Sequence, residues 1–177
     1  MQHPDLQESL SLFTSRLDTL IHLLRRAETH FEESQATLDL RLAPDMFPLR
    51  TQVVFACNQP RAFVLWCEGR QLPKTSAEVT SLGQAIAHVE GTKALLRSLE
   101  GADVRLPERA RIALAPGVTA DMSAHEYVND FLVPNFYFHL VTTYAILRMA
   151  GLPIGKADYM LHMRDLIRQD GDERAAV

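Results

Sequence analysis

Apolar side chains recur every three or four residues along the N-terminal part of the chain. The repeating positions are Leu6, Leu10, Phe13, Leu17, Leu20, Leu24, Ala27 and Phe31, with Gln, Ser, Arg, Asp and Glu between them. Residues spaced in this way lie on one face of an α-helix. The pattern therefore predicts a first long amphipathic helix.

A second helix is predicted to begin within Asp39 to Arg50, which contains Pro44 and Pro48, and to continue to about Trp66. Proline is favoured at the start of a helix and disfavoured inside it, so we expect Pro60 to kink or shorten this helix. The predicted inward residues are Leu49, Val53, Ala56, Phe63 and Cys67.

A third helix is predicted from about Ser76 to Leu99, where Thr75 and Glu78 would form an N-terminal capping box. Its apolar face consists of Val79, Leu82, Ile86, Val89 and Leu96. The helical rhythm then fails between Val104 and Met122.

A small hairpin is expected in this irregular stretch. Ile112 and Leu114 alternate before the sequence Ala115-Pro116-Gly117-Val118, which suits a type II turn. Ser123 and Glu126 then provide another capping box, and the fourth helix that they begin would end near Ala150-Gly151.

Four amphipathic segments joined in this way predict an all-α four-helix bundle with a short hairpin or irregular loop before the last long helix. The 177 residues are enough for one core, so we expect a single domain over residues 1–168. Residues 169–177 are expected to be a disordered tail.

The fourth helix carries polar groups in an apolar setting. Residues 131–147 contain no charged side chain, and the predicted inward stripe is Val128, Leu132, Asn135, His139, Thr142, Ile146 and Met149. Leaving a buried amide or imidazole unpaired costs about 1–3 kcal/mol. Asn135, His139 and Thr142 must therefore bond to one another, to water, to a ligand or to a metal.

Composition narrows the setting of the protein. The 22 acidic and 18 basic residues give a net charge of −4, without an aromatic-interleaved basic patch, so nucleic acid is not an expected partner. The uncharged stretch is short for a membrane span and contains Pro134, and the N-terminus lacks a signal-peptide pattern. We expect a cytoplasmic protein that does not bind membranes.

The two cysteines are expected to be free thiols that pack as small apolar side chains. Ten residues of helix separate Cys57 from Cys67 by about 15 Å, which is too far for a disulfide. His22, His30, His88 and His162 lie beside the apolar stripes without a mutual ligand spacing, so surface or flanking positions are expected for them.

Three segments resemble a known family. Residues 41–49 (RLAPDMFPL), 133–139 (VPNFYFH) and 154–159 (IGKADY) are similar to those of the domain-of-unknown-function family 1993. That family is similar in fold to the DinB-like bundles, which include metal-dependent thiol transferases. The resemblance implies a four-helix bundle with a pocket between the second and fourth helices.

DinB-like enzymes hold a divalent metal with one histidine from the second helix and two histidines, four residues apart, from a later helix. The corresponding pair here is Asn135 and His139, and the predicted second helix contains no histidine. A zinc, nickel, iron or manganese ion would therefore need Asp45, Gln52 or Gln59 to complete its shell around His139. Amide oxygens with one imidazole match zinc or nickel poorly, and we expect no metal.

The candidate site comprises Asp45, Gln52, Asn135, His139 and Thr142. One hypothesis is a small-ligand pocket around Asn135 and His139, and no reaction follows from it. A second is a metal-dependent transferase of DinB type. A third is a structural network that fixes the register of two helices, with His139 bonded to a backbone carbonyl or a glutamine.

Self-association is also expected. The run Phe136-Tyr137-Phe138 points in three directions around one helix, so at least one ring must face away from the central stripe. A homodimer contact through the fourth helix is one destination, with Tyr137→Glu expected to dissociate it. The alternative is that the loop and hairpin between Leu99 and Met122 cover this helix as a lid.

Overall fold

The computed structural model describes residues 5–32, 34–70, 78–101 and 106–167. Within these ranges, the long helices are α1 (Leu6–His30), α3 (Leu49–Cys67), α4 (Leu82–Arg97) and α5 (Val133–Met149). The shorter elements are α2 (Ser34–Asp39), the hairpin strands β1 (Arg109–Ala115) and β2 (Val118–Ser123), the π-helical segment η1 (Glu126–Leu132), α6 (Lys156–Tyr159) and the 3₁₀ segment η2 (Leu161–Leu166).

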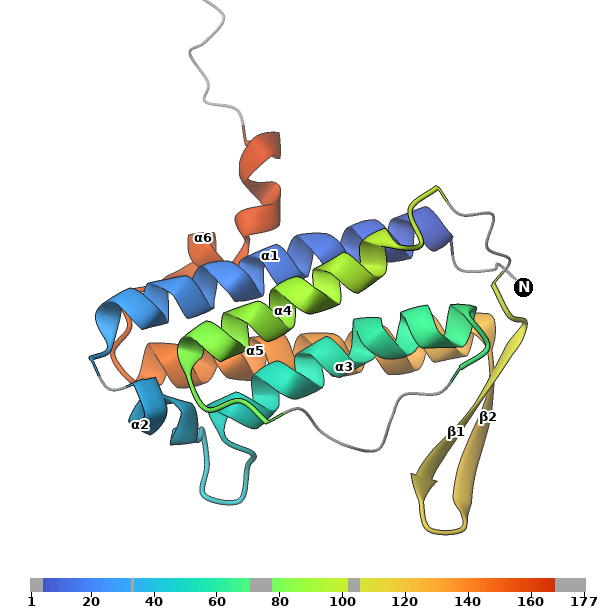
Figure 1. Cartoon of the computed structure of the whole chain (residues 1–177), viewed down its shortest axis with the longest axis horizontal. Coiled ribbons are helices and arrows are strands. Elements are labelled where there is room, and N and C mark those ends of the chain that lie inside the picture. Colours follow the sequence, from blue (N-terminus) through green and yellow to red (C-terminus); the bar gives the residue numbers. More distant parts are fainter. Residues whose placement is uncertain (1–4, 33, 71–77, 102–105, 168–177) are drawn as a thin grey trace, which may run out of the picture.

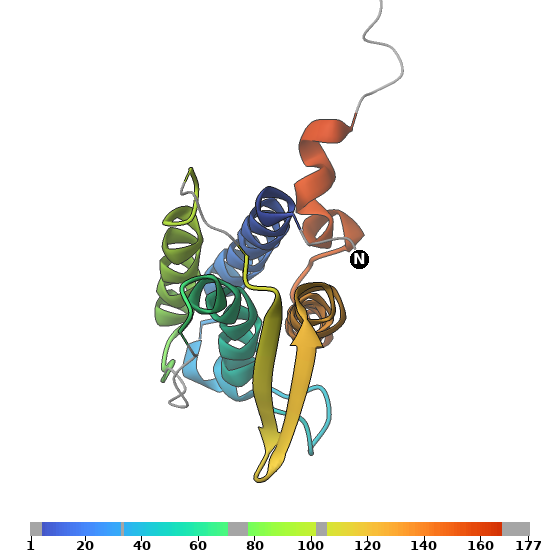
Figure 2. The same cartoon turned by 90° about the vertical axis from the view of Figure 1, so that its right-hand side faces the viewer.

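The long helices form a bundle in which each lies beside two others. Helix α1 contacts α4, α4 contacts α3, and α3 contacts α5 (Figure 1). The antiparallel hairpin extends away from one end of the bundle, as both views show (Figure 2). The predicted all-α bundle with a hairpin before the last long helix is confirmed.

Among the described residues, no helix combines the length and apolar character needed to cross a membrane.

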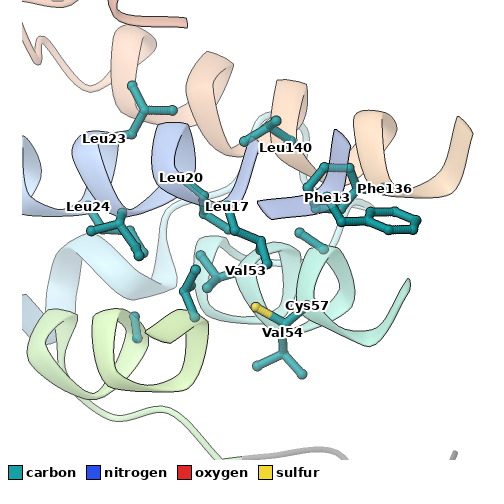
Figure 3. Close-up of a cluster of buried hydrophobic side chains, with 14 of the residues drawn as sticks. Phe13, Leu17, Leu20, Leu23, Leu24, Val53, Val54, Cys57, Phe136 and Leu140 are labelled. Atoms are coloured by element: carbon teal, nitrogen blue, oxygen red, sulfur yellow. The ribbon is translucent and has the colours of Figure 1, made fainter. Parts of the chain in front are cut away.

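The core lies between the four long helices, and Figure 3 shows part of it. Phe13 is fully buried, and its ring contacts Phe63 of α3 and Phe136 of α5 with centroids 5.8 and 5.4 Å apart. Leu17 and Leu20 continue this face along α1. Burying one such side chain stabilises the fold by about 1.5–3 kcal/mol, so the predicted apolar stripe of the first helix accounts for a large part of the core.

Helix α3 begins later than predicted. Pro48 occupies the N-cap position with φ −69°, and residues 40–48 form an irregular connection from α2. Pro44 and Pro48 both lack a backbone N–H, and each restricts the residue before it to extended conformations, so the helix starts only after the second proline. Pro60 does not shorten the helix, because α3 continues through it to Cys67.

Helix α4 also begins later than predicted. Ser81 is its N-cap and accepts a hydrogen bond from the backbone N–H of Gln84 at 3.1 Å. Thr75, which was expected to cap an earlier start, lies outside the described residues, as does the tail from Gln169. The predicted apolar face of this helix is buried throughout.

The hairpin and the start of the last helix follow the sequence prediction. Ala115 pairs with Val118 around Pro116 and Gly117, and Gly117 has the positive φ of 75° that a type II turn needs at its third position. The side chain of Glu126 accepts the backbone N–H of Ser123 at 2.8 Å, and the Ser123 hydroxyl accepts the N–H of Glu126 at 3.3 Å. This is the predicted capping box.

Candidate functional site

The candidate site is built on a hydrogen bond between α3 and α5. Gln52 lies in the first turn of α3 and is 1% exposed. Its Nε2 donates to the backbone carbonyl of Phe47 at 3.0 Å, and its Oε1 lies 2.8 Å from Nδ1 of His139. The glutamine thus connects the loop before α3 with the middle of α5.

This geometry fixes the tautomer of His139. A carbonyl oxygen cannot donate, so the Gln52 nitrogen must face Phe47 and the Gln52 oxygen must face the imidazole. Nδ1 of His139 therefore carries the proton, and Nε2 of the neutral ring is an acceptor. Burial lowers the pKa of His139 from 6.5 to about 4, so the ring is neutral at physiological pH.

Aromatic rings surround the imidazole. Phe55 of α3 contacts His139 with ring centroids 5.3 Å apart, and Phe138 contacts it from α5 at 5.2 Å. Phe47 packs against Phe55 at 5.2 Å. Phe47 and Phe138 are 55% and 56% exposed, so the half-buried histidine lies at the base of an aromatic surface that reaches solvent.

Asn135 and Thr142 do not join this pair. The Asn135 side chain donates to the carbonyl of Phe131 at 2.7 Å, and the Thr142 hydroxyl donates to the carbonyl of Phe138 at 2.7 Å. Each bond stays within the polar residue's own helix. The Asn135 side chain bonds the Phe131 carbonyl where the π-helical segment changes back to an α-helix.

The inward face of α5 differs in part from its prediction. Thr142 and Ile146 are buried as predicted, but Asn135 and His139 are only half-buried and Met149 is 55% exposed. The other buried residues of this face are Phe136, Leu140, Thr143 and Leu147. The π-helical segment η1 explains the difference, because each i→i+5 turn takes up more residues than an α-helical turn. The sequence signal for the π-helical segment is Pro134, which lies well inside a continuous helical pattern.

Asp45 is exposed on the loop before α3. Asp45 and Gln52 do not share a helix face, because Asp45 lies in the loop containing Pro44 and Pro48 and Gln52 lies in α3. In the structure Gln52 and His139 come together, while Asp45, Asn135 and Thr142 have other surroundings. The sequence did not indicate that Phe55 and Phe138 belong to this site, whereas both rings contact the imidazole.

The available donors do not fit a DinB-type metal centre. His139 is the only imidazole at the α3–α5 contact described here, and the oxygen of Gln52 is already bonded to it. Within the described ranges no three His, Cys, Asp or Glu side chains are grouped so that they could hold a metal ion. Carboxylates, thiolates or several imidazoles are the usual ligands of the metals considered, so the side chains at this site do not support metal-dependent chemistry.

The cysteines behave as predicted. Both Cys57 and Cys67 are free, and Cys57 is buried. Burial raises the pKa of each thiol to about 12. Because the thiolate is the reactive form, neither group suits nucleophilic chemistry at neutral pH.

Tyr137 faces α1 and not the exterior. Its hydroxyl accepts a hydrogen bond from Nε of Arg16 at 2.9 Å, and its ring packs against Phe136. Phe138 is the member of the aromatic run that faces outward. The substitution Tyr137→Glu would therefore disturb contacts within the bundle, so it is not a clean probe of a dimer.

Comparison with known proteins agrees with the fold. A crystal structure of a DinB family member from Shewanella denitrificans superposes with a TM-score of 0.72 at 25% sequence identity, over 89% of this chain and 96% of that one. No curated protein matches the sequence. The model of the family described as domain of unknown function DUF1993 matches residues 6–160, and the chain belongs to that family.

Proposed function

We propose that this DinB-like bundle is a binding protein, and that His139 accepts a hydrogen bond from a small ligand between α3 and α5. The observation that carries the proposal is the Gln52–His139 hydrogen bond of 2.8 Å, which leaves Nε2 of a neutral imidazole as the acceptor. Phe55 and Phe138 supply apolar walls on either side.

The chemistry of the site indicates the class of ligand. An aromatic wall favours a planar apolar body, and an unprotonated imidazole nitrogen requires a donor, such as a hydroxyl or an N–H. Asp45 lies on the exposed loop, and Gln52 uses both ends of its amide within the protein. A neutral ligand with one donor group therefore suits the site better than a charged one.

The transferase alternative would place a divalent metal on Nε2 of His139. A ligating histidine commonly donates its other N–H to a second group, and Gln52 provides such a partner. The remaining ligands would have to come from side chains that are bonded elsewhere, namely Asn135 and Thr142, or from the exposed Asp45. Binding without metal chemistry needs no such rearrangement and is the proposal we retain.

Self-association through the same face is a second candidate function. Phe47, Phe138 and Val141 are 55%, 56% and 45% exposed, and Phe47 and Phe138 flank the candidate site. Exposed apolar groups that lie close together mark interaction surfaces. A homodimer formed through this face would cover the aromatic surface and close the site around His139.

Phenol and anisole form a matched pair of probes for the ligand proposal, because methylation removes the donor and keeps the ring. Amide shifts around Gln52 and His139 should saturate with phenol with a Kd on the order of 1 mM, a value suited to a fragment. Anisole should bind several-fold more weakly. His139→Phe, which keeps an aromatic ring but lacks the acceptor, should remove the difference between the probes. Equal binding of both probes to the unchanged protein, or binding of neither, would contradict the proposal.

A further inference from the structure

A groove with a volume of about 550 Å³ lies along α1, away from the His139 site. Its first wall is one face of α1 and includes Ile21, His22, Arg25 and Arg26. Its second wall is formed by Leu152, Pro153 and Leu161, in the segment that follows α5 and contacts α1 (Figures 1 and 2). None of its lining residues belongs to α3 or α5.

Asp158 holds the two walls together. Its Oδ1 accepts from Nε2 of His22 at 2.8 Å and from Arg26 at 3.1 Å, and its Oδ2 accepts the backbone N–H of Gly155 at 2.8 Å. Arg26 also donates to the carbonyl of Pro153 at 2.8 Å. Arginine and histidine side chains of α1 are thus fixed in place before any ligand arrives, which reduces the entropy lost on binding.

The groove has more hydrogen-bond donors than these contacts use. A guanidinium group carries five N–H donors, and the described bonds engage one on Arg25, to Glu90, and two on Arg26. Among the lining residues, the one carboxylate is that of Asp18, which is paired with Lys93 of α4. Arg25 and Arg26 thus keep donors that the described bonds do not use, and the one acid of the lining is already paired with a lysine.

The groove also has an apolar side. Pro153 is exposed and Leu161 is half-buried, so these two side chains present the apolar surface, while Ile21 and Leu152 are buried beneath it. A purely inorganic anion would leave this surface unused, and a purely apolar molecule would leave the arginines unpaired. The combination matches a small molecule with an anionic end and an apolar body.

We propose that this groove binds a small amphipathic anion, with a carboxylate or phosphate at Arg25 and Arg26 and an apolar body against Pro153 and Leu161. Charge-assisted bonds from arginine to such groups are among the stronger and more directional ones in proteins. Glu90 and Asp158 neutralise part of the arginine charge from outside the groove, so affinity depends on the donors and the apolar contact together.

Two substitutions separate this role from a structural one. Arg25→Gln and Glu90→Gln remove the same exposed ion pair, whose side chains are 63% and 50% exposed, and such pairs contribute about 0–1 kcal/mol to stability. Only Arg25→Gln removes the donor for the ligand. Glu90→Gln releases Arg25 from its carboxylate partner, and thus leaves binding unchanged or makes it tighter.

The probes are 4-phenylbutyrate and phenyl phosphate, which distinguish a carboxylate from a phosphate ligand. The uncharged 4-phenylbutyramide and inorganic phosphate are the controls, and amide shifts in residues 18–30 and 152–161 report the position of binding. At least one organic anion should bind saturably in low salt, at least several-fold more tightly than either control. Arg25→Gln should weaken it about three- to tenfold.

His139→Phe should leave this binding unchanged, which separates the groove from the α3–α5 site. The proposal is overturned if neither organic anion binds, or if the amide or inorganic phosphate binds equally well. It is also overturned if Arg25→Gln and Glu90→Gln have the same effect on affinity, or if the shifts centre on Gln52 and His139.

Discussion

The side-chain oxygen of Gln52 accepts the Nδ1 proton of His139 at 2.8 Å, joining two residues 87 positions apart in the chain. Because Gln52 also donates to the carbonyl of Phe47, one buried amide connects the loop before α3, the first turn of α3 and the middle of α5. This single side chain positions the imidazole whose other nitrogen defines the candidate site.

Replacing Gln52 by leucine should destabilise the protein by about 1–3 kcal/mol, because two part-buried groups lose their hydrogen bonds. The change keeps the size and apolar stem of the side chain, so lost packing contributes little. Urea unfolding followed by circular dichroism measures the difference. Gln59→Leu is the matched control on the same helix, since Gln59 bonds only to the carbonyl of Phe55 one turn earlier. An equal loss for the two variants would show that the α3–α5 bond has no special role.

The low pKa of His139 makes stability depend on pH in a defined direction. The folded pKa of about 4 lies below the ordinary value of 6.5, so the unfolded chain binds the proton more readily. The free energy of unfolding therefore has its full value above pH 6.5, where His139 is neutral in both states. It decreases progressively as the pH falls towards 4, because the unfolded chain takes up the proton first. Unfolding free energies measured across this window should decline more steeply for the unchanged protein than for His139→Phe. Parallel curves would be inconsistent with a depressed pKa.

Asn135→Ala tests whether the amide serves the backbone or a ligand. The loss of its bond to the Phe131 carbonyl, in a half-buried position, should cost about 0.5–1.5 kcal/mol. The affinity for phenol should stay the same, because Asn135 does not contact His139 in the described bonds. If phenol binding instead weakened as much as it does in His139→Phe, Asn135 would belong to the ligand site.

Asp158→Asn should loosen the segment after α5. The neutral amide keeps the shape of the side chain but weakens the charge-assisted bonds from His22 and Arg26, at a cost of about 1–2 kcal/mol. Burial alone would raise the pKa of Asp158, but the bonds from His22 and Gly155 and the charge of Arg26 keep it below its usual value. Hydrogen exchange should therefore accelerate in residues 152–161 and stay unchanged in α3. Uniform acceleration across the chain would point to general destabilisation instead.

Self-association is tested with Phe138 and Tyr137. Phe138→Ser removes an exposed ring and should shift sedimentation towards the monomer, while unfolding stability changes by less than about 1 kcal/mol. Tyr137→Phe removes the bond from Arg16 and leaves the outward face intact, so its association state should match the unchanged protein. If the unchanged protein sediments as a monomer at all concentrations, a homodimer is excluded.

The parts of the fold that follow from local sequence were predicted well. The stripe of α1, the turn at Gly117 and the Ser123–Glu126 capping box each depend on residues close together in the chain. The same holds for the free cysteines, whose separation follows from helical rise. Periodicity and turn chemistry report such short-range features directly.

The errors came from features without a local signal. After the π-helical segment η1, Phe136 and Leu140 take the inward positions predicted for Asn135 and His139, so His139 lies at the edge of the buried face and not at its centre. His22 is partly exposed, in agreement with a flanking position, but its bond to Asp158, 136 positions later, had no signal in the sequence. A pairing at that separation is set by tertiary packing, and no spacing rule within one helix predicts it.

The tautomer of His139 is the most direct measurement of the central claim. Long-range ¹H–¹⁵N correlation spectra of the imidazole distinguish a protonated Nδ1 from a protonated Nε2. Nδ1 should carry the proton from pH 8 down to about 5, and Gln52→Leu should abolish this preference. A ring protonated at Nε2, or one that becomes charged near pH 6.5, would contradict the account, because Nε2 would then have no lone pair to offer a ligand.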